Sequence, residues 1–115
     1  MITGKQLAQV RPANTTAVSA YSPDADIRTE ILHILICNTT GSAATFRLFH
    51  DDDGTTYDET TALYWDNTIN ANASVSIAYE EGQGLWLINA ASNLAVRTGT
   101  NNALTFTLYG KEHQL

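Results

Sequence analysis

Hydrophobic and polar residues alternate with a period of two in several short segments of this chain, and turn residues separate the segments. The alternation is clearest in Ser74–Tyr79 and Ala103–Tyr109. This period is typical of strands that bury one face, and no segment shows a helical period. The predicted strands are Lys5–Val10 (a weak strand or an ordered arm), Thr15–Tyr21, Ile27–Asn38, Ala44–His50, Ala62–Asp66, Ser74–Tyr79, Leu85–Asn89, Asn93–Thr98 and Ala103–Tyr109. Their number and spacing predict an all-β fold, a single jelly-roll-like antiparallel β-sandwich of about eight strands.

The segment Ile27–Asn38 is the strongest predicted strand, and both of its faces are mainly apolar. A central strand that is covered on both sides has this pattern. We expect Leu32 to share the core face with Ile34 and Ile36, and Ala44–His50 to follow as the hairpin partner of this strand. The residues expected to be mostly buried are Leu32, Ile34, Ile36, Phe46, Leu48, Val75, Ile77, Leu85, Leu87, Leu104, Phe106 and Leu108.

The chain has 115 residues, which suits one β-sandwich domain over residues 1–115 with a short N-terminal arm at about residues 1–12. Its formal net charge is −6, and its six Lys and Arg residues are scattered. Binding of nucleic acid or of an anionic membrane surface requires clustered basic residues, so we expect neither partner. The surface is instead rich in threonine, asparagine and serine, and threonine favours strands.

One carboxylate cluster stands out, at His50-Asp51-Asp52-Asp53-Gly54 with Asp58 and Glu59 downstream. Asp51, Asp53 and Asp58 are candidate ligands for a cation, because hard oxygen ligands suit calcium. A simpler interpretation is a β-turn closed by Asp53-Gly54, with the flanking acids in water. We favour the turn, and the cation site stays open as the alternative.

No constellation for catalysis is present, so we expect no enzyme activity, no metal and no cofactor. The three histidines are far apart in the sequence and lack the spacing of a metal site, and no nucleophile elbow or phosphate-binding loop occurs. Cys37 lies at the end of an apolar strand without a charged neighbour, which predicts a buried, inert thiol.

Four aromatic residues could form a sugar-stacking platform or pack in the core or in an interface. The candidates for stacking a glycan are Tyr57 and Trp86, with Trp65 as a further indole. Tyr64 and Trp65 are adjacent on a predicted strand, so one of them must point away from the core. That side chain is a candidate contact with another subunit.

Three stretches resemble segments of small structural proteins from the virions of tailed bacteriophages. They are Ile34–Arg47, Leu63–Asp66 followed by Ile69–Asn72, and Leu104–Glu112, and the match spans roughly residues 5–112. The resemblance implies a β-sandwich that decorates or cements the capsid, often as a homotrimer, with the major capsid protein or another virion protein as partner. It implies a location in the virion, after synthesis in the cytoplasm of the bacterial host, and it brings no catalytic residues. A tail or baseplate part, or a module that binds host glycans, is the alternative.

Within this family expectation, two surfaces are candidates for contact with other chains. The N-terminal segment, with Ile2, Leu7 and Val10, is apolar enough to become ordered upon binding to the capsid. The edge with Tyr64 and Trp65 is the candidate for contact between subunits.

Overall fold

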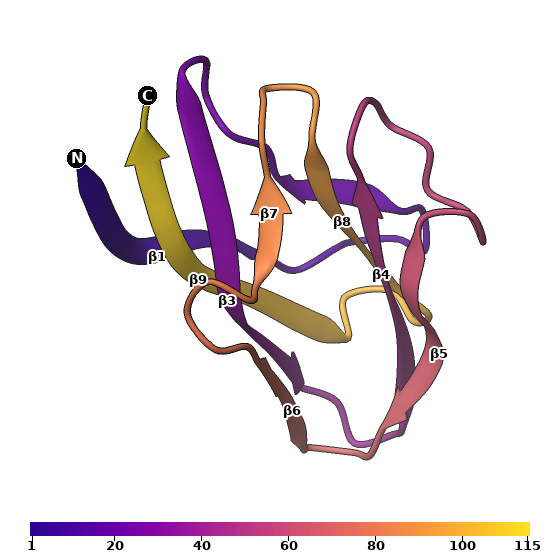
Figure 1. The fold of residues 1–115 in the computed structure, drawn as a ribbon. Helices are drawn as coiled ribbons and strands as arrows, with labels where there is room; N and C mark the ends of the chain where they lie inside the picture. The colour runs from indigo at the N-terminus through magenta and orange to yellow at the C-terminus, as the bar shows by residue number, and fades with distance from the viewer.

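The computed structural model describes residues 1–115 as two antiparallel β-sheets that pack face to face (Figure 1). The first sheet has the order β1 (Ile2–Val10), β9 (Leu104–Gln114), β3 (Ile27–Asn38) and β6 (Ser74–Ala78), with β7 (Leu85–Leu87) also paired to β3. The second sheet has the order β2 (Val18–Tyr21), β8 (Asn93–Thr98), β4 (Ala44–Asp51) and β5 (Ala62–Ile69). The all-β prediction is confirmed, and the bounds of Ile27–Asn38 and Asn93–Thr98 are as predicted.

The nine strands fill eight strand positions, because β6 and β7 occupy the same place beside β3. Leu85–Leu87 pairs with Thr29–Ile31, whereas Ser74–Ala78 pairs with His33–Cys37 farther along the same strand. Residues 79–84 therefore form a loop that interrupts what would otherwise be one strand. Two four-position sheets with long connections between them are the architecture of a jelly roll, which confirms the predicted fold class.

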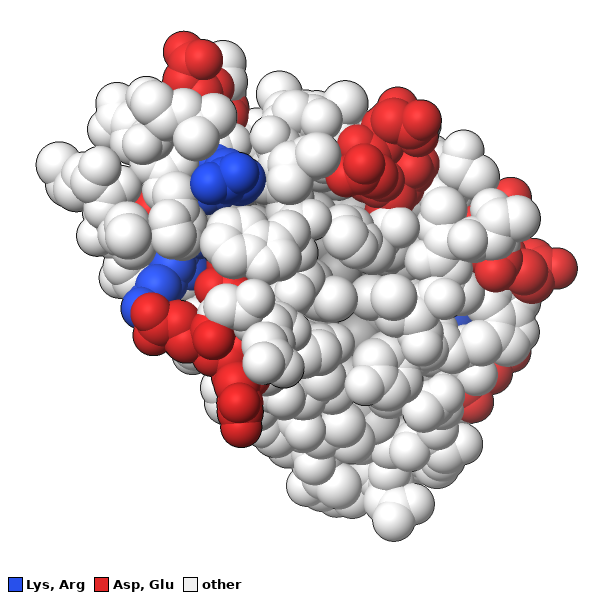
Figure 2. Space-filling model, in the orientation of Figure 1, with Lys and Arg blue, Asp and Glu red and all other residues white.

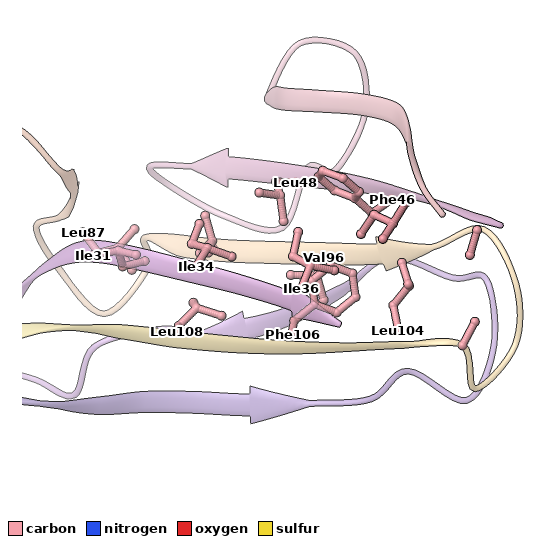
Figure 3. Close-up of a cluster of buried hydrophobic side chains, with 14 residues drawn as sticks. Ile31, Ile34, Ile36, Phe46, Leu48, Leu87, Val96, Leu104, Phe106 and Leu108 are labelled. Carbon is pink, nitrogen blue, oxygen red and sulfur yellow. The ribbon is translucent and has the colours of Figure 1, made fainter. Parts of the chain in front are cut away.

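The core lies between the two sheets and is built from the alternating inner residues of both (Figure 3). Eight of the residues that were expected to be buried are inaccessible to water: Ile34, Ile36, Phe46, Leu48, Leu87, Leu104, Phe106 and Leu108. Val75, Ile77 and Leu85 pack against this core but are only half-buried. They lie on β6 and β7, at an edge of their sheet, where one flank remains open to water.

The prediction for Leu32 is wrong, because a β-bulge reverses the alternation in β3 at this residue. Ile31 pairs with Gly110 and His33 pairs with Tyr109, so Leu32 has no partner of its own on β9. An extra residue in one strand changes which face the following side chains take. Ile31 is consequently buried in the core together with Ile34, and Leu32 is half-buried.

The hairpin predicted between Ile27–Asn38 and Ala44–His50 is also wrong. β3 belongs to the first sheet, whereas β4 pairs with β5 and β8 in the second. The connection at residues 39–43 therefore crosses from one sheet to the other. A short polar turn after an apolar strand is compatible with either geometry, so the local sequence does not distinguish them.

The N-terminal segment is a full strand of the first sheet and not a loose arm. β1 begins at Ile2 and pairs with β9 from Ile2↔His113 to Val10↔Phe106, interrupted by a bulge at Leu7. β9 is correspondingly longer than predicted and ends at Gln114. Of the two descriptions expected for this segment, the strand is the one observed, and it forms the outer edge of its sheet.

The two ends of the sandwich differ in charge. Backbone hydrogen bonds join loops 11–17, 39–43, 70–73 and 99–103 at one end, including Thr39 N to Ala103 O at 3.0 Å and Asn102 N to Pro12 O at 3.1 Å. We call this end the neutral end, because Arg11 is its only charged residue. Loops 22–26, 52–61 and 88–92 form the acidic end and hold six of the twelve carboxylates. In Figure 2 the turns below β5 and β6 are white, and red side chains lie elsewhere.

Candidate interaction surfaces

The carboxylates of the acidic loop accept hydrogen bonds from the loop itself. Asp51 is buried and accepts from the backbone amides of Thr56 at 2.6 Å and Asp53 at 3.3 Å. The hydrogen bond from Thr56 is the main cause that lowers the pKa of Asp51. Asp58 accepts from the backbone and side chain of Thr60 at 2.8 and 2.6 Å, which lowers its pKa as well.

This geometry is that of a turn stabilised by aspartate side chains. No three His, Cys, Asp or Glu side chains gather in an arrangement that could hold a metal ion. Asp51, Asp53 and Asp58 are thus not brought together as a cation site, in spite of their closeness in the sequence.

The outer face of the second sheet carries a cluster of Arg47, Trp65 and Asp66. The Arg47 guanidinium lies 3.5 Å from the centroid of the Trp65 ring. The same guanidinium donates two hydrogen bonds to the Asp66 carboxylate, at 2.7 and 2.9 Å, and this contact lowers the pKa of Asp66. Arg97 lies 3.6 Å from the same carboxylate. Phe49, behind the cluster, meets the Trp65 ring edge-on at 6.2 Å.

A bulge in β5 explains how one arginine contacts two adjacent residues. Phe46 pairs with Asn67 and Leu48 pairs with Tyr64, so Arg47 faces both Trp65 and Asp66. Asp66 has a positive φ of 53°, a conformation that aspartate and asparagine tolerate better than most residues. Beyond the aromatic pair, no sequence pattern indicates this cluster, because the role of Arg47 depends on the register of β4 against β5.

The prediction that one of Tyr64 and Trp65 points outward is confirmed. Tyr64 packs against the core, with its ring 5.8 Å from that of Phe46. Trp65 is 39% exposed on the opposite face. Trp65 is therefore the member of the pair that can touch another molecule.

The residues predicted for glycan stacking do not form a common platform. Tyr57 packs against Phe49 on the outer side of the second sheet. Trp86 lies on β7 in the first sheet, between Arg28 at 5.6 Å and His113 at 5.3 Å from its ring. Trp65 and Trp86 are thus on different sheets, and each has an arginine over its ring.

The structure contradicts the expectation of a buried Cys37, because its thiol is exposed on the outer face of β3. Farther along the same face, Glu30 is buried and accepts a hydrogen bond from the backbone amide of Gly84 at 2.8 Å, so the loop before β7 covers that part of the strand but not Cys37. His33 lies on the same face and forms a 2.6 Å hydrogen bond between its Nε2 and the hydroxyl of Ser76. No pocket opens on the surface of the molecule. The chain also contains no helix that is long and apolar enough to cross a membrane.

The three N-terminal residues predicted for an interface have different surroundings. Ile2 is 61% exposed at the start of β1. Leu7 and Val10 are partly buried against the core of the sandwich. Ile2 and the free backbone edge of β1 are therefore the accessible parts of this segment.

Comparison with known proteins gives matches in structure alone. No family model matches the sequence, and no curated protein sequence matches it. A chain of the virus-like particle of extra small virus from the giant freshwater prawn Macrobrachium rosenbergii is similar over 97% of this chain and 78% of its own length, with a TM-score of 0.53 and 10% identity. A chain of the T13 particle of infectious bursal disease virus is similar over 97% of this chain and 30% of its own length, with a TM-score of 0.51 and 10% identity. At this identity the likeness establishes the fold, which is a jelly roll of the kind that occurs in these virus particles.

Proposed function

We propose that this chain is a virion structural protein that works as a homo-oligomer, and that it decorates or cements the head of a tailed bacteriophage. The observation that carries the proposal is the jelly-roll fold, which two chains of virus particles share at TM-scores of 0.53 and 0.51. The sequence resemblance in Ile34–Arg47, Leu63–Asp66 and Leu104–Glu112 supports the narrower assignment to phage decoration proteins.

The contact between subunits would use the edge of the second sheet at β5. Trp and Arg are the residue types most enriched among those that dominate binding energy, and both occur here in one cluster. Arg47 is already held by its hydrogen bonds to Asp66, so little side-chain freedom would be lost when a partner covers Trp65. The backbone of β5 has no neighbour on its outer side.

The contact with the capsid would use β1. It is a nine-residue edge strand whose outer side pairs with no other strand. An extended partner segment can add to such an edge through main-chain hydrogen bonds. Ile2, at the end of the strand, would add apolar contact.

A trimer fits these two surfaces. Each copy would bury a patch against its neighbours, while three equal β1 edges face the capsid. A stable interface needs about 800 Å² per partner, which a small domain reaches more readily through several contacts. Three weak contacts then act together through high effective concentration.

Imaging of the intact particle at side-chain resolution, with light scattering on the free protein, tests the proposal. We expect trimers in solution and density for this chain on the head surface. Density on the tail or baseplate would replace the head assignment. A strictly monomeric protein at high concentration that is also absent from purified virions would exclude the proposal.

Substitution at the β5 edge tests the subunit contact separately. Trp65→Ala should reduce the mass measured by light scattering to that of the monomer while thermal unfolding remains cooperative. Ile88→Ala is the matched control, because Ile88 is a large exposed hydrophobic residue, at 48%, in the loop between β7 and β8.

A further inference from the structure

The outer face of the first sheet carries a patch that is unusual for a chain of this charge. Its outward residues come from His33–Cys37 on β3, Ser74–Ala78 on β6 and Thr105–Tyr109 on β9, and we call them the neutral face. These three ranges contain no Asp, Glu, Lys or Arg, although the chain has a net charge of −6. Charged residues lie outside these ranges, as in the ion pair of Lys111 with Glu81 on the same sheet and in Arg47, Asp66 and Arg97 on the outer face of the second sheet.

The strand pairings place the outward residues in rows across the sheet. Leu35 lies between Thr107 and Ser76, and Cys37 lies between Thr105 and Ser74. His33 lies beside Tyr109, with 6.0 Å between the ring centroids, and Tyr109 is 37% exposed. The rows combine small hydroxyl side chains with apolar or aromatic ones. Thr107 is the buried member of its row, and its hydroxyl accepts a hydrogen bond from Gln9 at 3.1 Å.

The sequence of β3 predicts that its outer face, like its inner face, is covered by other protein. Both faces of Ile27–Asn38 are mainly apolar, which is typical of a strand that is covered on both sides. The second sheet covers only the face with Ile34 and Ile36. On the opposite face, the loop before β7 covers Glu30 near the start of the strand, whereas Leu35 is half-buried and Cys37 is exposed.

From these observations we propose that the neutral face binds the same face of a second copy of this chain, in a two-fold symmetric contact. Two copies that each carry a charge of −6 repel one another, so a contact between them is favoured where no carboxylate must be brought near its counterpart. A cationic partner would instead be drawn to the acidic end. A low content of charged residues is also typical of the centre of protein–protein interfaces.

The size of the patch determines how strong this contact is. With strands about 4.8 Å apart and about 3.3 Å per residue, five residues on each of three strands project to roughly 240 Å². A standard interface takes about 800 Å² from each partner. The contact is therefore weak between free copies, and it becomes effective when other contacts already hold the copies close together.

The contact is separate from the subunit interface proposed at β5. A face that binds its own copy closes a pair, whereas a ring of three requires two different surfaces on each copy. The neutral face and the β5 edge belong to different sheets. Pairing through the neutral face would thus connect copies that belong to different rings.

Cys37 is the only cysteine, and its place on the neutral face makes it a native reporter of the contact. We expect maleimide labelling of Cys37 to slow as the protein concentration is raised, and a bismaleimide reagent to produce covalent dimers. The matched control is the double variant Cys37→Ser/Thr55→Cys, which moves the thiol to an exposed position at the acidic end. It should label at the same rate at every concentration and should give no dimer.

A charge placed on the neutral face should break the contact. Ser74 is exposed and pairs with Cys37 within the neutral face, so Ser74→Glu places one carboxylate from each copy inside the contact. We expect association to weaken roughly tenfold or more, because like charges in an interface cost several kcal/mol. Thr55→Glu adds the same charge outside the face and should weaken association much less than Ser74→Glu does, and circular dichroism checks that both variants fold.

Two results would overturn the proposal. One is full reactivity of Cys37 at high concentration without any covalent dimer. The other is unchanged association of the folded Ser74→Glu variant. If the protein forms oligomers only through β5, Cys37 stays fully reactive while the mass measured by light scattering still rises with concentration. The experiment therefore distinguishes absence of the neutral-face contact from absence of the proposed homo-oligomer.

Discussion

At the scale of single residues, the buried amide of Asn38 organises the neutral end. Its Nδ2 group donates to the carbonyl oxygens of Ser42 at 2.9 Å, Ile69 at 3.1 Å and Asn70 at 3.2 Å. Its Oδ1 atom accepts from the backbone amide and the hydroxyl of Thr40 at 3.0 and 2.8 Å. One side chain thus joins the crossing between the sheets at residues 39–43 to the turn after β5.

Replacement of Asn38 by alanine should therefore be strongly destabilising. Asn38→Ala removes the donor for three carbonyl groups and leaves buried polar atoms without partners, so we expect a loss of about 3 kcal/mol in the free energy of unfolding. Urea denaturation measures it. The control is Asn14→Ala, since Asn14 is exposed and accepts one hydrogen bond from Thr16. Similar stability of the two variants would show that the hydrogen bonds of Asn38 do not stabilise the neutral end.

The ion pair of Asp66 with Arg47 predicts a specific dependence of stability on pH. The pKa of Asp66 is lower in the folded chain than in the unfolded one, chiefly through the hydrogen bonds from Arg47. Its contribution is present above the unfolded value of about 3.9 and is lost as the pH falls through the lowered folded value. In Asp66→Asn this acid-sensitive contribution is absent, and asparagine also tolerates the positive φ of 53°.

We therefore expect the urea midpoint of the native chain to fall more steeply below pH 4 than that of Asp66→Asn. The difference should be small, because Asp66 is exposed and its ion pair is screened by water. Part of the acid sensitivity remains in the variant, since the pKa values of Asp51, Asp58 and Glu81 are lowered as well. Parallel pH profiles of the two proteins would show that the pair contributes nothing.

At the scale of the strand, the bulge at Leu32 can be tested by truncating two neighbours. Ile31 is completely buried, whereas Leu32 is half-buried. Ile31→Ala should cost about 3 kcal/mol in the free energy of unfolding, and Leu32→Ala less than half of that. Simple alternation along β3 predicts the reverse order. A larger loss in Leu32→Ala would mean that the bulge is not present in the folded protein.

The same bulge depends on a close approach between β3 and Gly110 of β9. A Cβ atom at residue 110 would lie within 3.0 Å of backbone atoms of Glu30 and Ile31. These atoms cannot move without disturbing the pairing, so Gly110→Ala should cost about 3 kcal/mol. Gly41→Ala is the control, because no atom lies within 4 Å of its added Cβ. Thermal unfolding of both variants provides the measurement, and equal melting temperatures would contradict the close packing.

The sequence was sufficient for the class of fold because the period of two is a property of each strand by itself. The bounds of Ile27–Asn38 were predicted correctly, and in the predicted strand Ser74–Tyr79 the side chains of Val75 and Ile77 pack against the core as expected. The prediction failed where the outcome depends on a partner strand. The bulge at Leu32 requires the register against β9, and the stacking of Arg47 on Trp65 requires the register against β5. Cys37 was expected to be buried because its strand is apolar on both faces, but the outer face is left open where Cys37 lies.

At the scale of the whole molecule, charge is separated along and across the sandwich. The neutral end and the neutral face adjoin, because Cys37 and Thr105 lie next to loops 39–43 and 99–103. The acidic end lies at the other end of the strands and holds Asp24, Asp26, Asp52, Asp53, Asp58 and Glu59. Copies that meet through their neutral faces with antiparallel strands would point their acidic ends apart, and this orientation has the lower repulsion.

This arrangement predicts that salt strengthens association. Added salt screens the repulsion between two chains of charge −6, while a contact without ion pairs loses nothing by screening. Raising NaCl from about 0.05 M to about 0.5 M, which shortens the Debye length several-fold, should tighten self-association in sedimentation velocity experiments. Asp53→Asn/Glu59→Gln removes two charges at the acidic end, so this variant should associate more tightly at low salt and respond less to added salt. Association that weakens with salt would instead indicate an ionic contact. Such a contact would arise if Arg47 of one copy paired with Asp66 of the other.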